Sequence, residues 1–97
     1  MQAVKKLEII TEALAMRAVM TVLEAYGVSG YTVMKDVVGK GERGLRSGDE
    51  LTQVLINHYL VTTCPAEHLQ EVVEAIRPIL RKCGGVCLVS DAYWVLH

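Results

Sequence analysis

The sequence has no phenylalanine, and it has only one tryptophan and four tyrosines among its 97 residues. Proteins that bind single-stranded nucleic acids stack the bases on exposed aromatic rings, and this chain has few rings to offer. A net charge of −1 and an isoelectric point near 6.3 leave no excess of basic side chains. We therefore do not expect nucleic acid as a partner.

Cysteine is scarce as well. Cys64, Cys83 and Cys87 are odd in number, and no two of them form a CxxC pair. We expect three buried or half-buried thiols in a reducing cytosol, rather than a disulfide framework or a zinc site. There is no HExxH motif and no acidic cluster, so no metal site is predicted.

Long apolar runs are also missing. No uninterrupted stretch approaches the length of a membrane span, and Met1–Lys6 lacks the apolar core of a signal peptide. We expect a cytoplasmic protein that does not insert into a membrane.

Hydrophobic residues nevertheless make up 52% of the chain, and the mean hydropathy is +0.30. The length suits one domain over residues 1–97. Because so small a domain can bury only part of this apolar surface, we expect an oligomer.

Runs of β-branched residues alternate with stretches of helical spacing. Thr11 is expected to cap the first helix and Gly27 to end it, whereas Pro78 should bend the second helix or end it early. The predicted elements are a strand over 4–10, a helix over 12–26, strands over 31–38 and 51–63, a helix from Pro65 to Gly84, and one strand or two short strands within 86–96.

The order βαββαβ predicts an α+β, ferredoxin-like fold, with a four-stranded antiparallel sheet and two helices on one face. Strands one and three are expected in the centre of the sheet, and strands two and four at opposite edges. The ends of these edge strands meet at one ligand only if a second subunit supplies one of them.

Residues 39–48 (GKGERGLRSG) hold four of the eight glycines and three of the ten Lys and Arg residues. Glycines let the backbone approach a ligand, consecutive N–H groups bind anions, and arginine adds bidentate bonds. A phosphate-binding loop and a solvated, mobile hairpin loop are equally compatible with this composition, because neighbouring acidic residues nearly cancel its charge. Gly84-Gly85 is a second glycine-rich turn.

No catalytic constellation is apparent, so we do not expect an enzyme. His58 falls inside a predicted strand and His68 in the first turn of a predicted helix, and neither neighbours a nucleophile in the sequence.

One set of residues resembles a known family. Gly30–Met34 (GYTVM), then Gly39–Gly41, then Arg43 and Arg46-Ser47 resemble the PII signalling superfamily. In particular they are similar to the PII-like proteins associated with bicarbonate transporters and carboxysomes. The segment KLEIITE at 6–12 and the Gly84-Gly85 pair extend the resemblance over nearly the whole chain.

The resemblance implies a homotrimer, a projecting T-loop at about 39–52, and adenine nucleotides in clefts between subunits. Ile10 and Thr32 would then lie near the base, and Gly39, Lys40 and Gly41 would line the base of the loop. Arg43, Arg46 and Ser47 would face the phosphates, and Gly84-Gly85 would form the short loop before the last strand.

The sequence departs from the best-known members of that family. It lacks their uridylylated tyrosine, has Arg43 where they have a glutamine, and lacks their basic segment after Gly84-Gly85. These departures favour ADP or AMP over ATP as the ligand. Cyclic AMP is a further candidate nucleotide, bicarbonate a second small anion, and no cofactor is expected to be obligatory.

The resulting hypothesis is a switch, in which phosphates order a T-loop that is disordered without ligand. The ordered loop would present or hide a surface for a partner protein, such as a bicarbonate transporter or a carboxysome-related protein. Two alternatives stay open: an amino-acid-sensing module of the same fold, and a small ferredoxin-like enzyme that uses His58 or His68.

Overall fold

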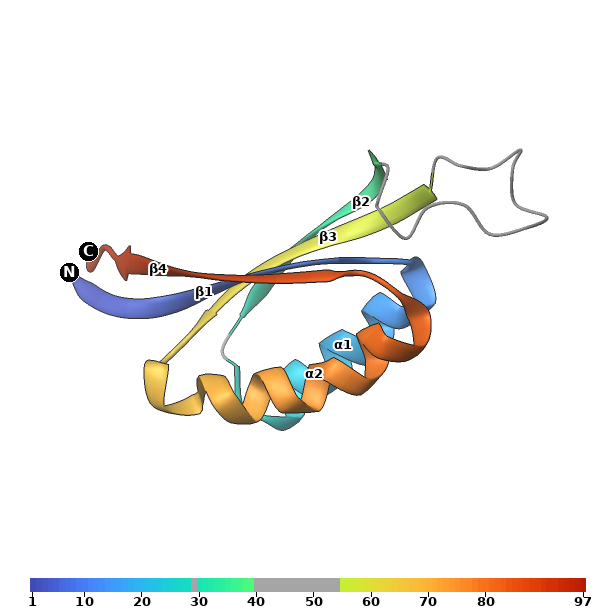
Figure 1. The fold of residues 1–97 in the computed structure, drawn as a ribbon. Coiled ribbons are helices and arrows are strands. Elements are labelled where there is room, and N and C mark those ends of the chain that lie inside the picture. The colour runs from blue at the N-terminus through green and yellow to red at the C-terminus, as the bar shows by residue number, and fades with distance from the viewer. Residues whose placement is uncertain (29, 40–54) are drawn as a thin grey trace.

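The structure, a computed structural model, describes residues 1–28, 30–39 and 55–97. Its elements follow the predicted order βαββαβ (Figure 1). They are β1 (Gln2–Thr11), α1 (Ala13–Ala25), β2 (Tyr31–Gly39), β3 (Leu55–Cys64), a 3-10 turn η2 (Ala66–His68), α2 (Leu69–Cys83) and β4 (Val86–Trp94).

The four strands form one antiparallel sheet in the order β2-β3-β1-β4. Both helices cover the same face of this sheet, and the two ends of the chain lie side by side, where Gln2 pairs with Trp94 (Figure 1). The predicted ferredoxin-like fold is confirmed, with β1 and β3 in the centre and β2 and β4 at opposite edges.

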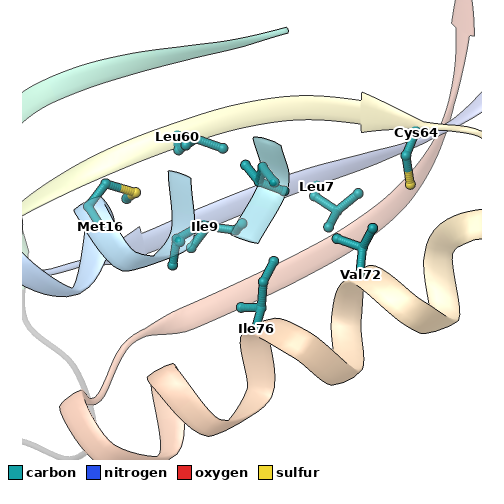
Figure 2. Close-up of a cluster of buried hydrophobic side chains, with 9 residues drawn as sticks. Leu7, Ile9, Met16, Leu60, Cys64, Val72 and Ile76 are labelled. Atoms are coloured by element: carbon teal, nitrogen blue, oxygen red, sulfur yellow. The ribbon is translucent and has the colours of Figure 1, made fainter. Parts of the chain in front are cut away.

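The core lies between the sheet and the helices (Figure 2). Alternate side chains of β1 point toward the helices, so Leu7 and Ile9 are fully buried, and Leu60 of β3 lies opposite Ile9. Each such side chain contributes about 1.5–3 kcal/mol through burial. The buried cluster consists of Leu7, Ile9, Met16, Val19, Leu23, Leu60, Cys64, Val72 and Ile76.

The prediction that Thr11 caps α1 is wrong. Glu12 occupies the N-cap position, without a side-chain hydrogen bond to the helix. Thr11 is instead the last residue of β1, where it pairs with His58 and its side chain is buried. Its hydroxyl donates to the carbonyl oxygen of Gly84, 73 residues away, so a tertiary partner replaced the local one.

Pro78 was predicted to bend α2 or to end it early, and the early end is wrong, because the helix continues to Cys83. Proline removes the N–H that would bond to the carbonyl of Glu74, one turn earlier, and its ring crowds that carbonyl. Val72 and Ile76, both buried against the sheet, anchor the helix before this point. The helix ends where the Gly84 N–H donates to the Leu80 carbonyl, at 2.8 Å.

The hairpin of β2 and β3 projects past the end of β1, because Thr11 is the last β1 residue to pair and its partner is His58 (Figure 1). A bulge interrupts β2 between Met34 and Val37. Within it, Asp36 has a φ of 59° and its N–H donates to Nδ1 of His58, at 3.2 Å. The predicted T-loop beyond Gly39, and the part of the third predicted strand over 51–54, lie outside the described residues.

Candidate functional site

The end of β1 and the start of β4 meet at the same end of the sheet as the projecting hairpin (Figure 1). Ile10, next to the last residue of β1, pairs with Val86, the first residue of β4. Residues that pair directly across antiparallel strands lie on one face, and Ile10 lies on the face that the helices leave open. This end of the sheet therefore brings a glycine turn and an open sheet face together.

The Gly84-Gly85 turn is closed tightly on β1. Gly84 has a φ of 82° and Gly85 a φ of 132°, values that L side chains rarely adopt. A Cβ atom on Gly85 would lie 2.6 Å from the carbonyl oxygen of Ile10 and 2.9 Å from Cβ of Thr11. Only a glycine lets the backbone pass this close to the end of β1.

Thr11 closes this turn, although it is not among the candidate site residues predicted from the sequence. Its side chain is 1% exposed, and its Oγ1 donates to the Gly84 carbonyl at 2.8 Å. One sequence signal could have indicated that Thr11 is buried. Leu7, Ile9 and Thr11 are alternate residues of β1, and alternate residues of a strand point to the same face. That alternation indicated a side chain directed into the fold.

The open face of the sheet carries two cross-strand rows beside this turn. The first row is Met34, Tyr59, Ile10 and Val86, and the second is Thr32, Val61, Glu8 and Leu88. Met34 is 54% exposed and Leu88 53%, so this face is apolar as well as open. The predicted base-binding residues Ile10 and Thr32 share it, in adjacent rows.

A hydrogen bond crosses these two rows. The Tyr59 hydroxyl donates to a carboxylate oxygen of Glu8 at 2.6 Å. That bond, followed by partial burial and the charge of Glu8, raises the pKa of Tyr59 above its ordinary value of 10.0. The Glu8 carboxylate, which accepts this hydrogen bond, therefore lies on a sheet face that is otherwise largely apolar.

The structure thus brings Ile10 and Gly84-Gly85 into contact and places Thr32 on the same face, but Gly39 lies elsewhere. Gly39 ends β2, and β2 and β4 are the two edges of the sheet, about 14 Å apart by strand spacing. The remaining predicted ligand residues, Lys40, Gly41, Arg43, Arg46 and Ser47, lie outside the described residues.

A groove of about 450 Å³ lies between α2 and β4, on the helix side of the sheet. It has an apolar floor, and Arg77 and Arg81 contribute to its walls. Arg77 also pairs with Glu74, at 3.0 Å. None of the predicted site residues that the structure describes lines this groove.

The histidines and cysteines show no reactive arrangement within the described residues. Nδ1 of His58 accepts the Asp36 N–H, and Nδ1 of exposed His68 lies 3.7 Å from a Glu71 oxygen. Burial raises the pKa of the Cys64 and Cys87 thiols, and all three cysteines are free and at least half-buried, as predicted.

No group of three metal-binding side chains occurs over 1–28, 30–39 and 55–97. None of the helices described is long and apolar enough to cross a membrane.

The described fold is similar to solved structures of one kind of protein. CPII, a nitrogen regulatory PII-like protein from Thiomonas intermedia bound to ADP, AMP and bicarbonate, is 26% identical; the match covers 98% of this chain and 96% of that one, with a TM-score of 0.83. CPII bound to ADP and bicarbonate is 29% identical over 93% of this chain and 86% of that one, with a TM-score of 0.77. A PII-like signalling protein from Thermus thermophilus is 22% identical, and the match covers 97% of this chain and 91% of that one, with a TM-score of 0.73. At this identity the match shows the fold alone. No curated protein matches the sequence.

The sheet order, the helices on one face and the projecting hairpin define a PII-type ferredoxin-like domain. The family model for nitrogen regulatory protein P-II matches residues 4–96. The chain therefore belongs to the nitrogen regulatory protein P-II family. It is a PII-like regulatory protein of the branch that includes CPII, and members of the family are generally trimeric.

Proposed function

We propose that this protein senses ADP or AMP in the cytoplasm, by binding the nucleotide in clefts between the subunits of a homotrimer. The observation that carries the proposal is the glycine turn, which is closed on the end of β1 beside Ile10. Such a turn brings backbone close to a ligand, and the apolar face beside it suits a flat base.

The separation of the glycine segments supports a cleft shared between subunits. Gly39 and Gly85 lie on opposite edges of one sheet, so a single ligand reaches both when they come from neighbouring chains. The open sheet face, with Met34 and Leu88 exposed, offers the apolar surface for such an assembly.

The T-loop supplies the cations in this proposal. Lys40, Arg43 and Arg46, with the Ser47 hydroxyl, bind the phosphates, and Gly39 and Gly41 let the backbone approach them. Each charge-assisted bond contributes about 1.5–3 kcal/mol before the cost of ordering the loop is subtracted. Micromolar affinity is the expected outcome, at about −8 kcal/mol.

Binding is coupled to a partner protein through this loop. Neutralisation of its cations orders the loop and changes the surface that the partner meets. CPII is bound to ADP, AMP and bicarbonate, so bicarbonate is the second ligand that we propose, and inorganic-carbon metabolism is the proposed setting. The partner is then a bicarbonate transporter or a carboxysome-related protein.

The test is a thermal-shift panel of ADP, AMP, ATP, cyclic AMP, bicarbonate and amino acids, followed by calorimetry and sedimentation. A ligand that binds only the folded state raises the melting temperature, and ADP or AMP should do so most. A response to amino acids alone would support the amino-acid-sensing alternative, and a monomer in solution would contradict the shared cleft.

The matched variants are Arg46→Ala and Arg17→Ala. Both remove one positive charge, but Arg17 lies exposed on α1, among the helices on the other face of the sheet. Arg46→Ala should weaken ADP binding about tenfold or more and leave the trimer intact, because it removes one charge-assisted bond. Equal affinity of the two variants would refute the role of Arg46.

A further inference from the structure

The bond between Thr11 and Gly84 sets the direction of the peptide that joins Gly84 to Gly85. The described chain has no cis peptide bond, and in a trans peptide the C=O and N–H groups point in opposite directions. Because Oγ1 of Thr11 holds the Gly84 carbonyl at 2.8 Å, the Gly85 N–H points away from Thr11. Outside the regular elements, no backbone carbonyl of a described residue accepts this N–H.

The turn follows the carboxyl end of α2, where the free carbonyl groups carry partial negative charge. An anion is unfavourable there unless N–H groups face it. Arg81 and Lys82 in the last turn of α2 offset part of this charge. The direction of the Gly84–Gly85 peptide decides whether a carbonyl or an N–H meets the anion.

Two consecutive glycines allow this peptide to rotate at little steric cost, because neither residue has a Cβ atom. Rotation would exchange the positions of the Gly84 carbonyl and the Gly85 N–H. The buried hydroxyl of Thr11 favours the orientation in which the carbonyl is directed inward. The same hydroxyl would lose its acceptor if the peptide turned over.

We infer that Thr11 is a positioning residue for the nucleotide site, which directs the Gly85 N–H toward a phosphate oxygen. The inference rests on the proposed binding of a nucleotide at this turn. Thr11 itself does not touch the ligand; it acts through the peptide that it holds.

The test compares Thr11→Val, Thr11→Ser and Thr62→Val by calorimetry with ADP and with adenosine, which has the base but no phosphate. Thr62 is the matched control, because its buried hydroxyl likewise donates to a glycine carbonyl, that of Gly30, before the start of β2. Thr11→Val should weaken ADP binding about tenfold and leave adenosine binding unchanged. Thr11→Ser keeps the hydroxyl and should bind ADP within about twofold of the wild type, as should Thr62→Val.

A second measurement uses the wild-type protein, so it does not depend on whether Thr11→Val folds. In ¹⁵N-labelled protein, the Gly85 amide resonance should shift on addition of ADP but not of adenosine. An unmoved Gly85 resonance while ADP binds, or equal ADP affinity of Thr11→Val and the wild type, would overturn the role of Thr11 alone. Equal losses in Thr11→Ser and Thr11→Val would overturn the role of its hydroxyl, and a wild type that does not bind ADP would overturn the proposed function as well.

Discussion

Three glycine-to-alanine substitutions separate the effect of backbone conformation from the effect of contact. Gly30 has open space around its Cβ position and no positive φ; Gly27 has the same open space but a φ of 73°. Gly85 combines a φ of 132° with a Cβ position 2.6 Å from the Ile10 carbonyl oxygen. The free energy of unfolding should therefore fall in steps along this series.

We expect Gly30→Ala to change the free energy of unfolding by about 0.5 kcal/mol or less. Gly27→Ala should cost about 1–2 kcal/mol, because alanine must adopt a left-handed conformation at the end of α1. Gly85→Ala should cost about 3 kcal/mol or more, since its φ falls in a region almost confined to glycine and backbone must also move. Such a loss is a large part of the about 5–15 kcal/mol that stabilises a typical domain.

The assay is urea unfolding followed by circular dichroism, at one fixed protein concentration because subunit association adds to the apparent stability. Unchanged m-values would show that the variants unfold from comparable states. A Gly85→Ala variant no less stable than Gly27→Ala would refute the close approach of the turn to β1. Measured with ADP present, the same variant should also bind more weakly, because the turn must shift to admit the methyl group.

Three further predictions concern the sheet faces. Tyr59→Phe removes the bond to Glu8 and should lower stability. Because the Tyr59 pKa is raised in the folded state, this contribution is fully present below pH 10.0 and is lost as the pH rises through the raised pKa, so urea titrations should show a smaller difference between wild type and variant at pH 11 than at pH 8. Burial raises the pKa of Cys64 and Cys87, so iodoacetamide at pH 8 should alkylate both thiols more slowly than free cysteine. Mass spectrometry measures these rates, and rates equal to that of free cysteine would contradict the burial of the two thiols. Leu88→Asp, on the open sheet face, should leave the circular dichroism of the chain intact and dissociate the proposed trimer in sedimentation experiments. A variant that still forms a trimer would place the subunit contacts elsewhere.

Much of the fold could be predicted because the signals are local. The alternation in β1 and the amphipathic spacing of α2 each indicate a buried face, and Gly27 ends α1 as expected, with the Val28 N–H donating to the Leu23 carbonyl at 3.0 Å. The order of the elements then allows few topologies, since crossovers are right-handed. Gly84-Gly85 could be predicted to end α2, because glycine readily adopts the positive φ found there.

The interpretations that failed depend on partners distant in the sequence. Thr11 was expected to cap a helix, because local rules do not include a carbonyl 73 residues away. Pro78 was expected to bend α2 or to end it early, and the early end failed because local rules do not include the packing of Val72 and Ile76 against the sheet. In both places, tertiary contacts outweighed a preference of about 1–3 kcal/mol.

The sequence by itself determined the element order and the antiparallel ferredoxin-like sheet, because both follow from residue type and spacing. The tertiary structure decided which groups meet: the Thr11 hydroxyl with the Gly84 carbonyl, the Asp36 N–H with His58, and the Tyr59 hydroxyl with Glu8. These contacts are set by strand register, and register is a property of paired strands that no single stretch of chain contains.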